Sequence, residues 1–104
     1  MHLDQATAIK HARQYAVLVS QQVNPLKIIL FGSYANGNWN KNSDIDIAVI
    51  IDRIDDNYLV ISKQLNKLTN NIDNRIEPVL MQMGSDQSGF LSSIMQNGMV
   101  LFEK

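Results

Sequence analysis

The residues best suited to chemistry lie in two neighbouring stretches of this 104-residue chain. The first is the pair Gly32-Ser33, which follows an apolar run and precedes a second glycine, Gly37. A glycine lets the backbone approach a phosphate closely, and the first N–H groups of a helix can bind an anion. The second is the pair Asp44 and Asp46, which opens another apolar run. Together they predict a phosphate cradle beside a divalent-metal site.

The two aspartates stand at alternate positions of a predicted strand, where side chains face the same way. Ile45, Ile47 and Val49 then face the opposite side and enter the core. Two carboxylates this close repel each other unless a cation lies between them, and magnesium prefers oxygen ligands. The alternative is a strand end with two solvated acids, because an isolated Asp-X-Asp pattern is common. For Ser33 the corresponding alternative is a simple helix N-cap.

Glu77 is a further candidate because it interrupts an otherwise apolar run. A buried acid without a partner is costly, so a catalytic role is one interpretation. Pairing with Arg75 and simple exposure at a sheet edge are the others. Pro78 favours an edge strand because it removes a donor from the ladder of hydrogen bonds.

The elements that must position these residues follow from the spacing of apolar positions. Recurrence every three or four residues predicts helices, and short β-branched runs predict strands. Because helices and strands alternate, we expect an α/β (α+β) fold, a mixed sheet backed by helices, in a single domain over 1–104. Tyr34 is expected to pack beneath the turn, and Phe90, Leu91, Ile94 and Met95 to face inward. The expected elements are helices over 4–22 (N-cap Asp4), 56–71 and 86–96, a helical turn over 33–37, and strands over 27–31, 44–51, 75–82 and 99–102.

Composition limits the classes of protein that need considering. The chain has no cysteine, which excludes disulfides and thiolate metal sites and favours a cytoplasmic location. Its formal net charge of −1 predicts no broad basic face and no direct nucleic-acid binding. No apolar run approaches the roughly 18 residues of a membrane span, and the N-terminus lacks a secretory pattern. A ligand rich in phosphate would therefore be held locally, by backbone N–H groups and metal ions.

The order of these features resembles the nucleotidyltransferase superfamily of DNA polymerase beta type. Within it, the chain is most similar to the minimal nucleotidyltransferase (MNT) group, the antitoxin halves of HEPN–MNT toxin–antitoxin pairs. The resemblance covers most of the chain and implies the minimal nucleotidyltransferase fold. It implies that Gly32 and Ser33 bind the β- and γ-phosphates of a nucleotide. It also implies that Asp44 and Asp46 are metal ligands, with Glu77 as the third carboxylate.

The loop between the two motifs departs from the family pattern. The group usually has an arginine before the second glycine, where this chain has Asn36. An amide supplies hydrogen bonds but no charge, so some affinity for anions would be lost. Lys41 could compensate as a point charge, with Ser43 as a further nucleotide contact, although Lys41 can also be read as a solvated loop residue. Trp39, in the same loop, could stack on a base or a partner.

The resemblance further implies transfer of AMP from ATP, the substrate, to an acceptor hydroxyl, with two Mg²⁺ ions as cofactors. The expected acceptor is a tyrosine of a HEPN ribonuclease toxin, which the modification neutralises within a hetero-oligomer. One alternative is a non-catalytic antitoxin that blocks the toxin by binding alone. Another is a transferase that acts on a small molecule or an RNA end, against which the short chain and near-neutral charge count.

Overall fold

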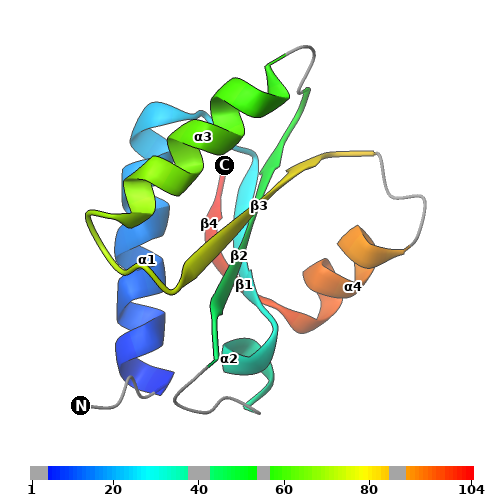
Figure 1. Ribbon diagram of the computed structural model, residues 1–104. Helices are drawn as coiled ribbons and strands as arrows, with labels where there is room; N and C mark the ends of the chain where they lie inside the picture. Colours follow the sequence, from blue (N-terminus) through cyan, green and yellow to red (C-terminus); the bar gives the residue numbers. More distant parts are fainter. Residues whose placement is uncertain (1–4, 38–42, 54–56, 85–88) are drawn as a thin grey trace.

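A computed structural model describes residues 5–37, 43–53, 57–84 and 89–104, which form a four-stranded sheet with helices on both faces (Figure 1). The elements in chain order are α1 (Gln5–Gln22), β1 (Lys27–Phe31), α2 (Ser33–Asn36), β2 (Ile45–Ile51), α3 (Tyr58–Thr69), β3 (Ile76–Gln82), α4 (Phe90–Asn97) and β4 (Met99–Glu103).

The sheet is mixed and has the strand order β3-β2-β1-β4. β1 pairs antiparallel with β2 and with β4, and β2 pairs parallel with β3. The register places Asp46 of β2 between Phe31 of β1 and Glu77 of β3. The predicted mixed sheet backed by helices is therefore confirmed. β3 is an edge strand, as Pro78 indicated.

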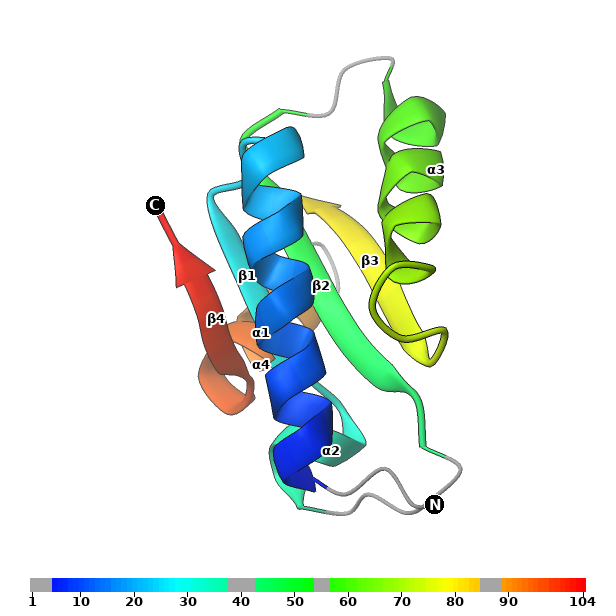
Figure 2. The same ribbon diagram turned by 90° about the vertical axis from the view of Figure 1, so that its left-hand side faces the viewer.

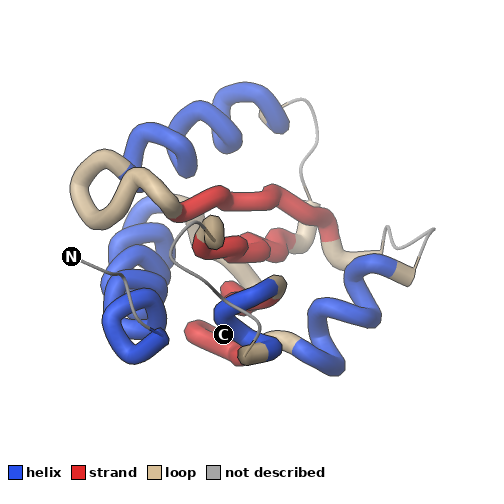
Figure 3. The backbone as a smooth tube through the Cα atoms, turned by 60° about the horizontal axis from the view of Figure 1, so that its bottom comes forward, coloured by secondary structure: helices blue, strands red, loops and turns tan. Residues whose placement is uncertain are grey.

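Helices cover the two faces unequally, as Figures 2 and 3 show. α1 and α3 lie over one face, where Ile45, Ile47 and Val49 are fully buried in the larger core cluster. α4 lies over the other face, where Ala48 and Ile50 contact its buried side chains. This alternation along β2 puts Asp46 on the face that α4 covers only in part. No helix in the described part of the chain is long and apolar enough to cross a membrane.

Side chains of α1 donate hydrogen bonds both to α2, which follows β1, and to α3. The Nε2 group of Gln5 donates to the backbone oxygen of Tyr34 at 2.8 Å, and Tyr34 is fully buried beneath the turn, as expected. Further along, the hydroxyl of Tyr15 donates to the backbone oxygen of Leu65 in α3 at 2.7 Å. Burial raises the pKa of Tyr15, so this hydroxyl stays protonated.

Several predicted boundaries differ from the structure. β3 begins at Ile76, one residue later than predicted, because Arg75 lies in a turn where its N–H donates to Asp73 Oδ1 at 2.8 Å. α3 ends at Thr69 and the next residues form a turn, in which the N–H groups of Asn70 and Asn71 donate to carbonyls of the last helical turn. The predicted starts at Asp4, 56 and 86 fall outside the described residues.

The prediction that α4 buries four apolar side chains was wrong for two of them. Leu91 and Ile94 are buried, but Phe90 is 46% exposed and Met95 is 37% exposed. A helix of eight residues presents only a narrow stripe to the sheet, and residues three apart fill that stripe here. Phe90 instead contacts Phe31 edge-on, with ring centroids 5.8 Å apart.

Candidate active site

The turn after β1 is built around a glycine that touches the acidic site. Gly32 has φ 75° and ψ −150°, a conformation that residues with a Cβ rarely adopt. Its carbonyl accepts hydrogen bonds from the N–H groups of Ala35 and Asn36, which closes α2. Gly37 then ends α2 with φ 80°. A Cβ on Gly32 would collide with Asp46 Oδ2, so any other residue would displace this carboxylate as well as strain the backbone.

Asp46 is the electrostatic centre of the site. Adjacent strands lie about 4.8 Å apart, so the in-register pairing brings Asp46 and Glu77 together on one face of the sheet. Burial of the carboxyl raises the pKa of Asp46 to about 6, with further contributions from the charges of Glu77 and then Asp44. Asp44 lies exposed just before β2. The three acids predicted from the sequence therefore influence one another at one end of the sheet.

This donor set fits magnesium in chemistry, because it consists of hard carboxylate oxygens whose mutual repulsion a cation would relieve. The described residues nevertheless contain no group of three or more His, Cys, Asp or Glu side chains gathered closely enough to hold a metal ion. Asp44 and Glu77 are both exposed, so their side chains can rotate toward Asp46 without disturbing the core. The backbone therefore brings the three acids to one end of the sheet, but their side chains do not converge closely enough to hold an ion.

The remaining predicted residues surround this centre. Ser33 is half-buried at the first position of α2, and Ser43 is half-buried two residues before β2. The N–H of Ile45 donates to the carbonyl of Arg75 at 2.9 Å, which fixes the start of β2 against the turn before β3. Lys41 and Trp39 lie outside the described residues. Glu77 is exposed on its edge strand, in agreement with one of the three interpretations of this residue.

A pocket of about 250 Å³ adjoins the glycine turn, and sequence reasoning did not anticipate it. One wall comes from the end of β1 and from α2, and the other from α4. The apolar spacing of α4 predicted a helix that faces the core, but it gave no signal for proximity to Gly32. The lining residues are Phe31, Gly32, Asn36, Phe90, Ser93, Ile94, Asn97 and Gly98.

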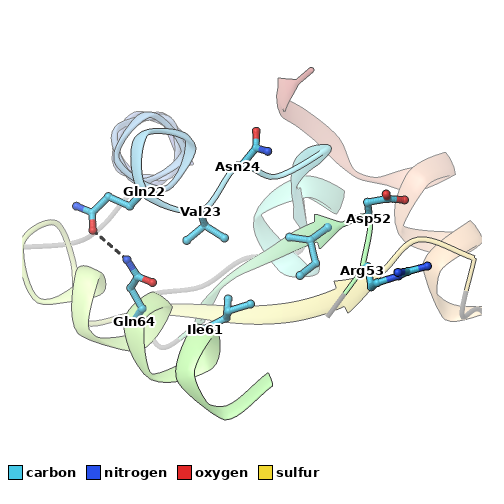
Figure 4. Close-up of a pocket in the computed structure, with 8 residues that line it drawn as sticks. Gln22, Val23, Asn24, Asp52, Arg53, Ile61 and Gln64 are labelled. Carbon is cyan, nitrogen blue, oxygen red and sulfur yellow. Dashed lines mark hydrogen bonds between the residues drawn. The ribbon is translucent and has the colours of Figure 1, made fainter. Parts of the chain in front are cut away.

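A larger cavity of about 410 Å³ lies at the opposite end of β2 and is separate from the acidic site (Figure 4). It opens between the end of α1 and the middle of α3, where Gln64 Nε2 donates to Gln22 Oε1 at 3.1 Å. Asp52 is the carboxylate among its lining residues. The strand end at Ile51 lies at the far end of β2 from Asp46, so this cavity takes no part in the site.

Comparison with known proteins places this geometry in context. The family model described as polymerase beta, nucleotidyltransferase matches residues 14–104, which include every candidate site residue. A crystal structure of a provisionally named nucleotidyltransferase from Sulfolobus solfataricus superimposes with a TM-score of 0.69 at 18% identity, covering 96% of this chain and 84% of that one. At that identity the likeness shows the fold alone.

Two solved toxin–antitoxin structures are more similar in sequence. A toxin–antitoxin with AMP-PNP has a TM-score of 0.64 and 27% identity over 88% of this chain and 73% of that one. The toxin–antitoxin MntA-HpeT, in a variant with two aspartates two positions apart changed to glutamate, has a TM-score of 0.56 and 25% identity over 98% and 75%.

One curated protein is also similar to this chain. It is MJ0604 of Methanocaldococcus jannaschii, provisionally named a protein adenylyltransferase, with 53% identity over 34 residues. The match spans 33% of this chain and 33% of that protein.

Proposed function

Because this chain belongs to the polymerase beta nucleotidyltransferase family, we propose that it transfers AMP from ATP to a hydroxyl group of a partner toxin and so acts as an antitoxin. The observation that carries the proposal is the position of Asp46, which lies against Gly32 on one side and opposite Glu77 on the other. In this arrangement the glycine turn, which we propose binds phosphate, lies against one of the paired acids.

The chain's own residues would divide the reaction between them. Gly32 and Ser33 would hold the β- and γ-phosphates, and Asp44, Asp46 and Glu77 would hold two Mg²⁺ ions. Bound magnesium supplies positive charge that offsets the charge on the phosphate oxygens during an in-line displacement.

The displacement balances in atoms and charge. The acceptor oxygen bonds to the α-phosphorus, the bond from that phosphorus to the oxygen bridging to the β-phosphate breaks, and pyrophosphate leaves. The hydroxyl proton passes to the carboxylate of Glu77, whose exposed position on the edge strand leaves it accessible to an acceptor.

The similar proteins support a protein acceptor. One of them carries the name of a protein adenylyltransferase, and two are toxin–antitoxin structures, one with AMP-PNP. The aspartates changed in MntA-HpeT are spaced as Asp44 and Asp46 are here. The partner in our proposal is a HEPN ribonuclease toxin, and the acceptor is a tyrosine hydroxyl near its active site.

A second candidate function is an antitoxin that blocks its toxin by binding alone. Two observations favour it. Asn36 stands where the family pattern has arginine, and the described residues hold no group of three metal-binding side chains. The two candidates differ in whether the carboxylates are needed.

The deciding experiment measures the intact mass of the product of the neighbouring gene after incubation with this protein, ATP and magnesium. We expect a gain of one or more AMP units, which the Asp44→Asn/Asp46→Asn variant fails to produce. Asp52→Asn, an exposed aspartate at the other end of β2, is the matched control and should transfer normally. A stable complex of unchanged mass, formed equally well by the double variant, would establish the binding antitoxin instead.

A further inference from the structure

The pocket beside the glycine turn has the composition of a site for a neutral, planar group. All eight lining residues are uncharged, so the pocket offers no cation to a triphosphate. It contains two aromatic rings, two carboxamides and one hydroxyl. Its volume of about 250 Å³ is below the range of roughly 300–1,000 Å³ for sites that hold a whole ligand. It therefore suits one part of a larger molecule.

α4 turns a mixed apolar and polar face toward this pocket. Phe90, Ser93, Ile94 and Asn97 recur at the spacing of one helical face. Ile94 is the buried residue of this face, and the Nδ2 group of Asn97 donates to the Oγ atom of Ser93 at 3.4 Å. The ring of Phe90 is half exposed and meets Phe31 edge-on, so a ring face stays accessible for stacking.

The pocket lies on the opposite side of Asp46 from Glu77. Figure 1 shows α2 and α4 toward the same end of the sheet, and residues of both line the pocket. In the strand order β3-β2-β1-β4, Glu77 belongs to the edge strand β3 and Phe31 to β1, with Asp46 between them. An acceptor that approaches Glu77 is therefore on the opposite side of Asp46 from the pocket, which leaves the pocket for the donor nucleotide.

We propose that this pocket binds the adenine base of the donor and that Asn97 makes it selective for adenine over guanine. A carboxamide presents one donor group and one acceptor atom, which match the amino group and adjacent ring nitrogen of adenine. Guanine offers two acceptors at the same edge. The inference rests on the proposed transfer of AMP from ATP and adds to it the place where the base binds and the residue that selects it.

Binding of analogues that cannot react tests the pocket without the partner. The probes are α,β-methylene-ATP and α,β-methylene-GTP, whose α–β linkage resists transfer, and tripolyphosphate, which has no base. Calorimetry with magnesium should show the ATP analogue bound about tenfold more tightly than either of the others. Asn97→Ala should weaken the ATP analogue about tenfold, remove the preference over the GTP analogue, and leave tripolyphosphate unchanged.

Two further variants complete the design. Gln96→Ala removes the neighbouring exposed carboxamide, which does not line the pocket, and should bind as the wild type does. Phe90→Leu keeps an apolar side chain but removes the ring, and should weaken both nucleotide analogues and spare tripolyphosphate.

The pocket proposal fails if tripolyphosphate binds as tightly as the ATP analogue, or if Asn97→Ala leaves the preference for adenine intact. Transfer to the partner is measured separately. Transfer with no preference among bases would overturn the proposed base selection and leave the proposed transferase activity intact. Selective binding without transfer would support the base selection and overturn the transferase activity.

Discussion

At the scale of single residues, Asp46 carries an electrostatic cost in the folded state. Its pKa rises from 3.8 to about 6, so the folded chain binds a proton more tightly than the unfolded chain does. Stability therefore falls as pH rises from about 4 to about 6, and the penalty is complete above that window.

Asp46→Asn should therefore stabilise the metal-free protein at pH 7.5. We expect a gain of about 1 kcal/mol in the free energy of unfolding, after allowance for solvent screening of this partly exposed group. The gain should vanish at pH 4, where the wild-type carboxyl is itself neutral. Urea unfolding at the two pH values measures it, with Asp52→Asn as the control. A stabilisation of equal size at both pH values would show that ionisation is not its cause.

Gly32 and Gly37 allow backbone strain to be separated from contact with the acid. Both have positive φ, but a Cβ on Gly37 meets no atom within 4 Å, whereas one on Gly32 would collide with Asp46. From the backbone alone, Gly37→Ala should cost about 1–2 kcal/mol of stability, and Gly32→Ala up to about 3 kcal/mol because its ψ of −150° is in a region that is essentially restricted to glycine. Only Gly32→Ala should also lower AMP transfer, by about 100-fold, because it displaces the Asp46 carboxylate that we propose holds magnesium. Equal losses of transfer in the two variants would assign the effect to strain.

At the scale of elements, α1 and α3 are held together by a hydrogen bond inside the core. The Tyr15 hydroxyl is fully buried and reaches the carbonyl of Leu65. Tyr15→Phe should lower the free energy of unfolding by about 1 kcal/mol, because it removes a buried hydrogen bond and keeps the ring. Tyr58→Phe, at the exposed start of α3, is the matched control and should be neutral. If the two variants unfold alike, this hydrogen bond contributes no net stability.

The sequence predicted elements better than it predicted contacts between them. Alternation along β2 correctly assigned Ile45, Ile47 and Val49 to the core, because period-two burial is a local pattern. The approach of α4 to the glycine turn depends on tertiary packing and left no local signal. Phe90 is an example, because the spacing of apolar residues along a short helix is the same whether they face the core or a pocket.

At the scale of the whole molecule, the two ends of the sheet have different character. The carboxylates, the glycine turn and the neutral pocket gather where β1 ends and β2 begins. The cavity at the far end of β2 is lined by three carboxamides, three aliphatic side chains, Arg53 and Asp52 (Figure 4). A ligand that binds at the acidic end should raise the free energy of unfolding of the whole domain, because it binds the native state and not the unfolded chain.

Magnesium should raise the thermal midpoint of the whole protein in a pH-dependent way. At pH 7.5, magnesium at a concentration about 100 times its dissociation constant would add about 2.7 kcal/mol to the free energy of unfolding. This gain corresponds to a rise of roughly 10 °C or more in the thermal midpoint of a domain of this size. At pH 5 the gain should be smaller, because Asp46, with its pKa near 6, must first lose a proton. Differential scanning fluorimetry with and without a chelator measures the shift. The Asp44→Asn/Asp46→Asn variant should show none, and a shift of wild-type size in that variant would place the ion elsewhere on the molecule.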